Sequence, residues 1–310
     1  MSEPGSIRVF APAKLNLFLE LLGKRPDGYH ELETVMVAVN RYDRIQIIPR
    51  DDPQIRVMTR WHPSNAVWRQ HLGQSASKLL ELPSGPSNLA YQAAQLMRRH
   101  CQSQQGFELK IEKTIPAGAG MGGASSDAAA VLRGVAGALN AKVAPETMHD
   151  LAAQLGSDVP FFLNTRYPAA IARGRGERLQ PIPASASIFF VVVFPPRSLS
   201  TAEVYRKCLD CPGSARLGML STFLKKGDTR GLAGIMFNRL QQAACGLFPE
   251  LAGLLRQMEQ IGLAGCQLTG SGSACFGLAQ HRWHAQRAVA QLKARGFRVA
   301  FVANPIVIAA

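Results

Sequence analysis

The sequence "IPAGAGMGGASSDAA", residues 115–129, joins a predicted strand to a predicted helix through a loop that contains Gly118, Gly120, Gly122 and Gly123. Glycine loses more conformational freedom on folding than any other residue, so a loop this rich in glycine needs a reason. A glycine turn that opens onto a helix presents unpaired backbone N–H groups and the positive end of the helix dipole. These features bind anions, and we therefore predict that the loop binds a triphosphate.

Other glycine-rich loops fit this stretch less well. Gly118, Gly120 and Gly123 satisfy the GxGxxG spacing, but a dinucleotide-binding unit also needs a second parallel strand after the helix. Here a second predicted helix, residues 144–156, follows instead. The Gly-Lys-Ser/Thr ending of a Walker loop and the protein-kinase signatures are absent. A tight strand-to-helix connection with no ligand is the remaining structural alternative.

The first half of the chain predicts both strands and helices. Apolar and polar residues alternate in "FELKIEK" (107–113), which predicts a strand. Residues 7–22 predict two strands broken at Pro12. After the glycine loop, Ser125 and Ser126 have the chemistry of a helix N-cap, and Asp127 falls in the first turn. Further strands are predicted over 33–39 and 43–49, and a further helix over 87–101.

The second half predicts a hairpin around Gly174 and Gly176, a buried strand over 188–194 and a Gly/Ser hairpin over 266–279. A chain of 310 residues exceeds one ordinary core. We expect an α+β protein of two domains, residues 1–165 and 166–310. Residues 59–86 are the least regular part, and they predict either a lid over a site or a peripheral insertion.

Composition excludes several classes of protein. The longest strongly apolar run, "IFFVVVF" (188–194), is far too short to cross a membrane, and the N-terminus has no signal-peptide pattern. We therefore expect a cytoplasmic protein. The formal net charge is +14, but the basic residues do not gather into a block, so a polyanionic small substrate is favoured over nucleic acid. Cys208 and Cys211 form one CxxC pair without the second pair that a structural zinc site needs.

Two further stretches contain residues suited to catalysis. In "PAKLNLFL" (12–19), Lys14 and Asn16 are two residues apart on a predicted strand, so they share one face. In "LGSDVPFFL" (155–163), Asp158 follows a predicted helix end. Taken singly, these are an exposed strand lysine and a turn aspartate.

Together, the ordered motifs resemble the GHMP kinase superfamily. The resemblance extends from about residue 8 to 280, and it includes "KRPDGYHELET" (24–34) and "LTGSGSACFGL" (268–278). The motif "RPDGYHELET" is the specific part, because homoserine, galactose and mevalonate kinases lack it. It is similar to that of kinases whose acceptor is a cytidine-diphosphate-linked methylerythritol.

The resemblance implies a two-domain α+β GHMP kinase fold with the active site in the cleft between the domains. It implies transfer of the γ-phosphoryl group of ATP, with Mg²⁺, to the 2-hydroxyl of that acceptor. Asp158 matches the catalytic base and Lys14 its partner. Asn16, Tyr29, His30 and, less closely, Tyr205 match acceptor-binding positions, with Tyr29 and Tyr205 stacking on the cytosine and His30 reading its edge. The positions that match nucleotide binding are Asn88, Lys113, Pro116, Ala117, Gly118, Ala119, Gly120, Met121, Gly122, Gly123, Ala124, Ser125 and Ser126, and Ser126 is also the expected Mg²⁺ ligand.

The chain departs from the family pattern in places. Met121 and Ala124 replace the usual Leu and Gly of the loop, and "NRLQ" (238–241) replaces an Asn-Asp-Leu-Glu common in relatives, so no role is assigned there. Residues 59–86 are longer than expected. Two alternatives stay open at this point, a sister GHMP kinase for another small alcohol and a basic RNA-binding protein without catalysis. The sequence leaves the oligomeric state open.

Overall fold

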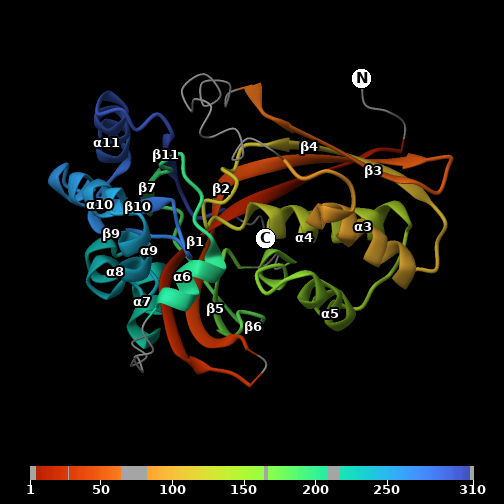
Figure 1. Cartoon of the computed structure of the whole chain (residues 1–310), viewed down its shortest axis with the longest axis horizontal. Helices are drawn as coiled ribbons and strands as arrows, with labels where there is room; N and C mark the ends of the chain where they lie inside the picture. The colour runs from red at the N-terminus through yellow and green to blue at the C-terminus, as the bar shows by residue number, and fades with distance from the viewer. Residues whose placement is uncertain (1–4, 27, 64–81, 164–166, 209–216, 308–310) are drawn as a thin grey trace.

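The computed structural model describes residues 5–26, 28–63, 82–163, 167–208 and 217–307. These residues form two β-sheets, each with helices packed on it (Figure 1). One sheet has seven strands and is built mainly from the first half of the chain. The other has four strands and belongs to the second half.

The seven-stranded sheet is organised around two long antiparallel strands, β1 (Ile7–Lys24) and β2 (His30–Arg50). The predicted break at Pro12 is wrong, because β1 continues through it and only the pairing register shifts between Pro12 and Ala13. Strand β2 likewise joins two segments that the sequence predicts separately. The other strands of this sheet are β3 (Ile55–Trp61), β4 (Gly106–Lys113), β5 (Ala169–Gly174), β6 (Arg178–Ile182) and the short β8 (Phe237–Asn238).

Helices α3 (Leu89–His100), α4 (Gly123–Ala138) and α5 (Pro145–Leu155) pack together, and α4 covers one face of the sheet (Figure 1). Alanine and glycine on α4 let its backbone approach the strands closely. A Cβ atom on Gly134, for example, would lie 2.2 Å from Ile47 Cδ1. This close packing holds α4, which begins where the glycine loop ends, against the sheet.

The second sheet has the order β11-β7-β10-β9, and its predicted buried strand is β7 (Phe189–Val193). The predicted Gly/Ser hairpin is confirmed as β9 (Ala264–Leu268) and β10 (Cys275–Ala279). The remaining strand is β11 (Ala300–Ala303). Helices of this half are α6 (Thr201–Lys207), α7 (Leu217–Lys226), α8 (Thr229–Ile235), α9 (Gln241–Leu247), α10 (Glu250–Gln260) and α11 (Arg282–Ala294).

The domain boundary at residue 165 stays a prediction. The hairpin of β5 and β6 follows that residue, yet β5 pairs with β2 in the first sheet, so sheet membership favours a division after Ile182. Of residues 59–86, 64–81 lie outside the described residues, and residues 59–61 belong to β3 rather than to an irregular segment. Cys211 also lies outside them.

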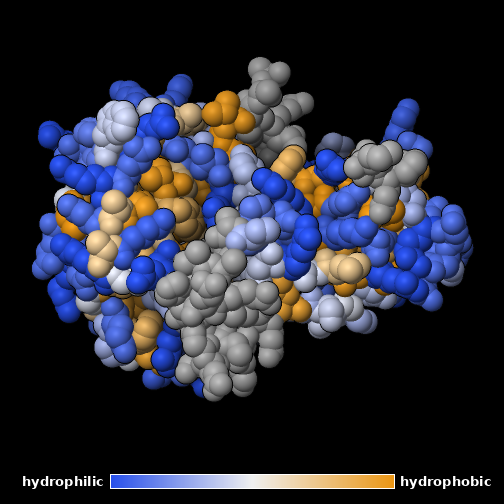
Figure 2. Space-filling model, turned by 90° about the horizontal axis from the view of Figure 1, so that it is seen from above, coloured by the Kyte–Doolittle hydropathy of each residue, from blue (hydrophilic) through white to orange (hydrophobic). Residues whose placement is uncertain are grey.

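No helix within the described ranges is long and apolar enough to cross a bilayer. The face seen from above is largely hydrophilic, with apolar side chains in separate patches (Figure 2). Location in the cytoplasm stays a prediction.

Candidate active site

The glycine loop adopts a backbone that favours glycine. Gly118, Gly120 and Gly122 have φ angles of 66°, 75° and 72°, in the left-handed region. A Cβ atom on Gly120 would lie 2.1 Å from the carbonyl oxygen of Thr269, so this position admits no side chain. The predicted N-cap is wrong, because Gly122 caps α4 and the helix begins at Gly123. The first N–H groups of α4, which have no partner within the helix, therefore come directly after the loop.

A cavity of about 370 Å³ opens over this loop. Its lining includes every expected nucleotide-binding residue except Ser126. These are Asn88, Lys113, Pro116, Ala117, Gly118, Ala119, Gly120, Met121, Gly122, Gly123, Ala124 and Ser125. Asn88 caps α3, since its Oδ1 accepts a hydrogen bond of 2.8 Å from the N–H of Ala90. Ser126 is buried, and its Oγ has no hydrogen-bond partner among the described residues.

Lys113 is held by two buried carboxylates that the sequence analysis did not connect with it. Its Nζ donates to Asp127 Oδ2 at 2.5 Å and forms a second ion pair with Asp43. Burial raises the pKa of Asp127 to about 7, against the opposing effect of Lys113. Burial disfavours the charge of Lys113, but Asp127 and Asp43 together raise its pKa. The lysine therefore stays charged and ties β4 to β2 and to α4.

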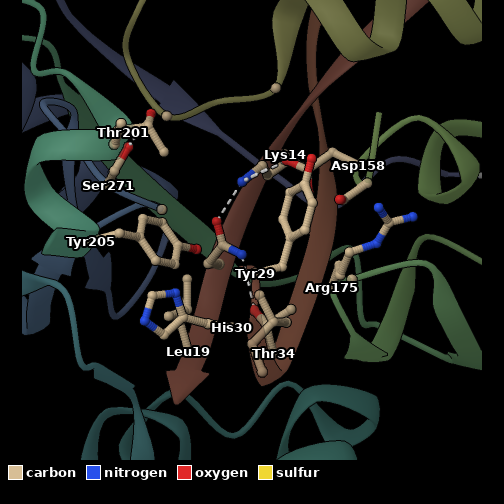
Figure 3. A pocket seen from close by; sticks show the side chains of 18 of the residues that line it. Lys14, Leu19, Tyr29, His30, Thr34, Asp158, Arg175, Thr201, Tyr205 and Ser271 are labelled. Carbon is tan, nitrogen blue, oxygen red and sulfur yellow. Dashed lines mark hydrogen bonds and ion pairs between the residues drawn. The ribbon is translucent and has the colours of Figure 1, made fainter. Parts of the chain in front are cut away.

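A second cavity, of about 830 Å³, contains the expected catalytic pair. Lys14 Nζ lies 3.4 Å from Asp158 Oδ2, and the side chain of Lys14 is almost fully buried. The same Nζ donates a hydrogen bond of 2.5 Å to Asn16 Oδ1, as Figure 3 shows. Asp158 lies in the turn after α5, and its side chain is 35 % exposed. It can thus accept a proton from a group that enters the cavity, beside a fixed positive charge.

Asn16 is positioned by two threonines that sequence reasoning missed. Its Nδ2 donates to Thr34 Oγ1 at 2.9 Å, and its backbone N–H donates to Thr269 Oγ1 at 3.1 Å. Thr269 is fully buried, and its Oγ1 also lies 3.3 Å from the carbonyl oxygen of Gly120. Both threonines fall within motifs that the sequence displays, "RPDGYHELET" and "LTGSGSACFGL". The amide of Asn16 therefore orients Lys14 as well as lining the cavity.

The side chains expected to bind the acceptor, those of Tyr29, His30 and Tyr205, line the same cavity as Lys14 and Asp158. The rings of His30 and Tyr205 lie 5.4 Å apart and are inclined at 43°. Tyr29 is 54 % exposed, and the guanidinium carbon of Arg175 lies 5.0 Å from the centre of its ring. Burial raises the pKa of Tyr205, so its hydroxyl stays protonated. These rings and polar edges suit a flat heterocycle.

Gly120 and Gly122 line both cavities. The backbone of the glycine loop is therefore the boundary between the two sites. A Cβ atom on Gly122 would lie 2.8 Å from Phe162 Cζ and 3.1 Å from Lys14 Cγ, so glycine there also lets Lys14 lie beside the loop. A phosphoryl group of a ligand bound by the loop would therefore lie close to a ligand bound beside Asp158 in the second cavity.

The stretch "NRLQ" (238–241) supports the turn around Gly270, which lines the larger cavity. Asn238 Nδ2 donates to the carbonyl oxygens of Leu268 and Gly270, at 2.8 and 2.9 Å. Arg239 makes two hydrogen bonds, 2.6 and 2.8 Å, to the buried carboxylate of Glu20. These residues hold the turn around Gly270 against β1, a structural role that the sequence left unassigned.

Comparison with known proteins agrees with this geometry. The model for the GHMP kinases N terminal domain matches residues 88–166, and that for the GHMP kinases C terminal matches residues 220–298. A 4-diphosphocytidyl-2-C-methyl-D-erythritol kinase from Geobacillus sp. (strain WCH70) is 38% identical over 281 residues, which cover 90% of each chain. The chain belongs to this kinase family.

Further relatives support membership of the 4-diphosphocytidyl-2-C-methyl-D-erythritol kinase family. One from Pelotomaculum thermopropionicum is 36% identical over 289 residues, 93% of this chain and 94% of the relative. The crystal structure of a 4-(cytidine 5'-diphospho)-2C-methyl-D-erythritol kinase matches with a TM-score of 0.76 and 35% identity, over 96% of this chain and 98% of that one. The predicted two-domain GHMP kinase fold is confirmed. A homoserine kinase from Cytophaga hutchinsonii, 18% identical with a TM-score of 0.71, shares the fold alone.

Proposed function

We propose that this protein is an ATP-dependent phosphotransferase that phosphorylates the 2-hydroxyl of 4-diphosphocytidyl-2-C-methyl-D-erythritol, a step of the non-mevalonate route to isoprenoid precursors. The observation that carries the proposal is the shared boundary of the two cavities. One glycine loop lines both, and Lys14 and Asp158 lie on the acceptor side. The family relatives do not favour an RNA-binding protein or a sister kinase.

On the nucleotide side, the loop N–H groups and the start of α4 would hold the phosphates of ATP. The side chain of Lys113 is already neutralised by Asp43 and Asp127. We therefore infer that Lys113 acts mainly by shaping this cavity and fixing α4, rather than as a strong phosphate-binding charge.

The residues present fit Mg²⁺. Ser126 Oγ and Asp127 Oδ1 are buried and have no hydrogen-bond partner among the described residues, and oxygen atoms are the ligands that Mg²⁺ prefers. Mg²⁺ usually takes few protein ligands beside substrate phosphates, and no group of three or more His, Cys, Asp or Glu side chains in the described part of the chain forms a metal cage. Ser126 would hold the ion, which when bound neutralises charge on the phosphates.

On the acceptor side, Asp158 would accept the proton of the attacking hydroxyl, and Lys14 would stabilise charge on the transferring phosphoryl group. Tyr29, His30 and Tyr205 would bind the cytosine. Phosphoryl transfer needs positioning and charge stabilisation more than covalent chemistry, and Thr34, Thr269 and Asn16 supply that positioning for Lys14.

We expect Ser126→Ala to separate stability from activity. Removing a buried hydroxyl without a partner should leave the free energy of unfolding unchanged or raise it by about 1 kcal/mol. The Mg²⁺ concentration for half-maximal turnover should rise by about 10-fold, the loss of one polar ligand interaction. Urea titration and Mg²⁺-dependent kinetics measure the two effects. Loss of stability with an unchanged Mg²⁺ requirement would assign Ser126 a purely structural role.

His30→Ala should raise KM for the cytidyl acceptor and leave KM for ATP unchanged. One buried hydrogen bond left unmade costs about 1–3 kcal/mol, which corresponds to roughly 5- to 150-fold. The ring also contacts Tyr205, so thermal unfolding of the variant serves as the control. Equal changes in KM for both substrates would contradict a role in cytosine recognition.

The proposed function is tested by measuring ATP consumption with the cytidyl acceptor, beside ATP alone, homoserine and mevalonate. We expect turnover with the cytidyl acceptor only. Faster turnover with another alcohol would favour a sister kinase.

A further inference from the structure

The hairpin of β5 and β6 contains three arginines with different partners. Arg173 Nε pairs with Glu33 Oε1 at 2.8 Å, and Arg178 pairs with Glu31. Arg175, in the turn between the strands, lines the acceptor cavity. Within the described residues no carboxylate pairs with its guanidinium, and the nearby Glu177 accepts only the backbone N–H of Arg175, at 2.7 Å. Two of the three arginines thus pair with a carboxylate, Arg178 with one that it shares with Arg25, and the arginine that lines the cavity pairs with none among the described residues.

Arg175 lies beside Tyr29 and in the same turn as a neighbour of Asp158. Its guanidinium stacks on the ring of Tyr29, and Figure 3 shows it on the side of Tyr29 away from Tyr205. The next residue, Gly176, lies beside Asp158, because a Cβ atom there would be 3.8 Å from Asp158 Oδ1. The turn therefore spans the distance from the cytosine site to the proton acceptor.

The cavity has an excess of positive charge. Among the described residues, its charged lining residues are Lys14, Lys24, Arg175, Arg206 and one carboxylate, Asp158, which pairs with Lys14. The ring of Tyr29 contacts the half-buried guanidinium of Arg175, but no carboxylate among the described residues compensates its charge for the lost hydration. An anionic part of the ligand would supply that compensation.

We propose that Arg175 is a specificity-determining residue that binds the diphosphate of the acceptor. The inference rests on the proposed function, because a diphosphate links the cytidine held by Tyr29, His30 and Tyr205 to the alcohol that must reach Asp158. Arg175 lines this cavity beside the ring of Tyr29, and the next residue, Gly176, lies beside Asp158, so a ligand that extends from the aromatic residues to Asp158 passes close to this turn. Its planar set of N–H donors matches phosphate oxygens in a bidentate geometry, which lysine cannot reproduce.

The test compares binding of cytidine and cytidine 5′-diphosphate by calorimetry. A saturating non-hydrolysable ATP analogue with Mg²⁺ keeps both probes out of the nucleotide cavity. In Arg175→Gln we expect cytidine affinity to change by less than about 2-fold and diphosphate affinity to fall by about 10- to 100-fold, the range for lost hydrogen bonds to a charged group. The diphosphate affinity of Arg175→Lys should fall between that of the unsubstituted protein and that of Arg175→Gln. Arg178→Gln, which removes the same charge from the same hairpin outside the cavity, is the matched control and should change neither affinity.

The outcomes distinguish the two levels of the proposal. An equal loss for both probes in Arg175→Gln would mean that Arg175 only supports Tyr29, and it would overturn the inference. So would an unchanged preference of that variant for the diphosphate. Failure of the unsubstituted protein to bind either probe would instead contradict the proposed function, and the inference with it.

Discussion

Asp158→Asn is expected to lower kcat by about 10²–10⁴-fold, the usual contribution of a general base, while ATP affinity stays unchanged. Asparagine has nearly the same shape, so the packing of the turn after α5 is kept. It cannot accept the hydroxyl proton at neutral pH, and it carries no charge opposite Lys14, which lies 3.4 Å away. The loss should therefore appear in kcat rather than in nucleotide binding.

Steady-state kinetics with both substrates and a nucleotide titration check this expectation. Asp150→Asn is the matched control, because that carboxylate belongs to α5 but its side chain is 79% exposed. The control should keep the kcat of the unsubstituted protein. Retention of more than half of that kcat by Asp158→Asn would contradict the assignment of the base.

Lys113→Met is expected to lower the free energy of unfolding by about 3–5 kcal/mol, the cost of leaving a buried charge without its partner. Asp43 and Asp127 are both buried and both pair with Lys113. Without the lysine, two carboxylates would share one low-dielectric site, so at least one would have to take up a proton. The backbone N–H groups of Thr114 and Ile115, which donate to Asp43, cannot replace the lost charge.

Urea denaturation measures this effect, and the chain offers two controls. Lys110→Met removes a surface lysine of the same strand that pairs with Glu108 at 3.3 Å, and it should cost less than about 1 kcal/mol. Adding Asp127→Asn to Lys113→Met should restore part of the stability, since one unpaired charge is then removed. If Lys113→Met lowered the free energy of unfolding by less than Lys110→Met does, the structural role of Lys113 with Asp43 and Asp127 would be refuted.

Local chemistry in the sequence predicts the centre of the site. The glycines of the loop, the shared face of Lys14 and Asn16, and the position of Asp158 after a helix each follow from neighbouring residues. All of these agree with the structure, whereas the predicted start of the helix after the loop does not. Ser125 and Ser126 resemble caps, but Gly122 in a left-handed conformation takes that position, because the loop must also pass close to Phe162 and Lys14.

The supporting residues could not be predicted, because their partners are distant in the chain. Asp43 and Lys113 meet only when β2 pairs with β4. Thr269 reaches Asn16 and Gly120 only when the second sheet packs on the first. Without an expected partner, a buried aspartate or threonine has no signal of its own in a single sequence. The continuity of β1 through Pro12 likewise depends on a register shift against β2 rather than on local preference.

The central claim is that phosphate passes from the loop to a hydroxyl beside Asp158. It is tested most directly by identifying the product formed from ATP and 4-diphosphocytidyl-2-C-methyl-D-erythritol. Mass spectrometry should show one ADP for each singly phosphorylated acceptor, and phosphorus–carbon coupling in NMR spectra should place the new phosphate on the 2-hydroxyl carbon. Release of inorganic phosphate without a modified acceptor, or a phosphate on another hydroxyl, would contradict the account.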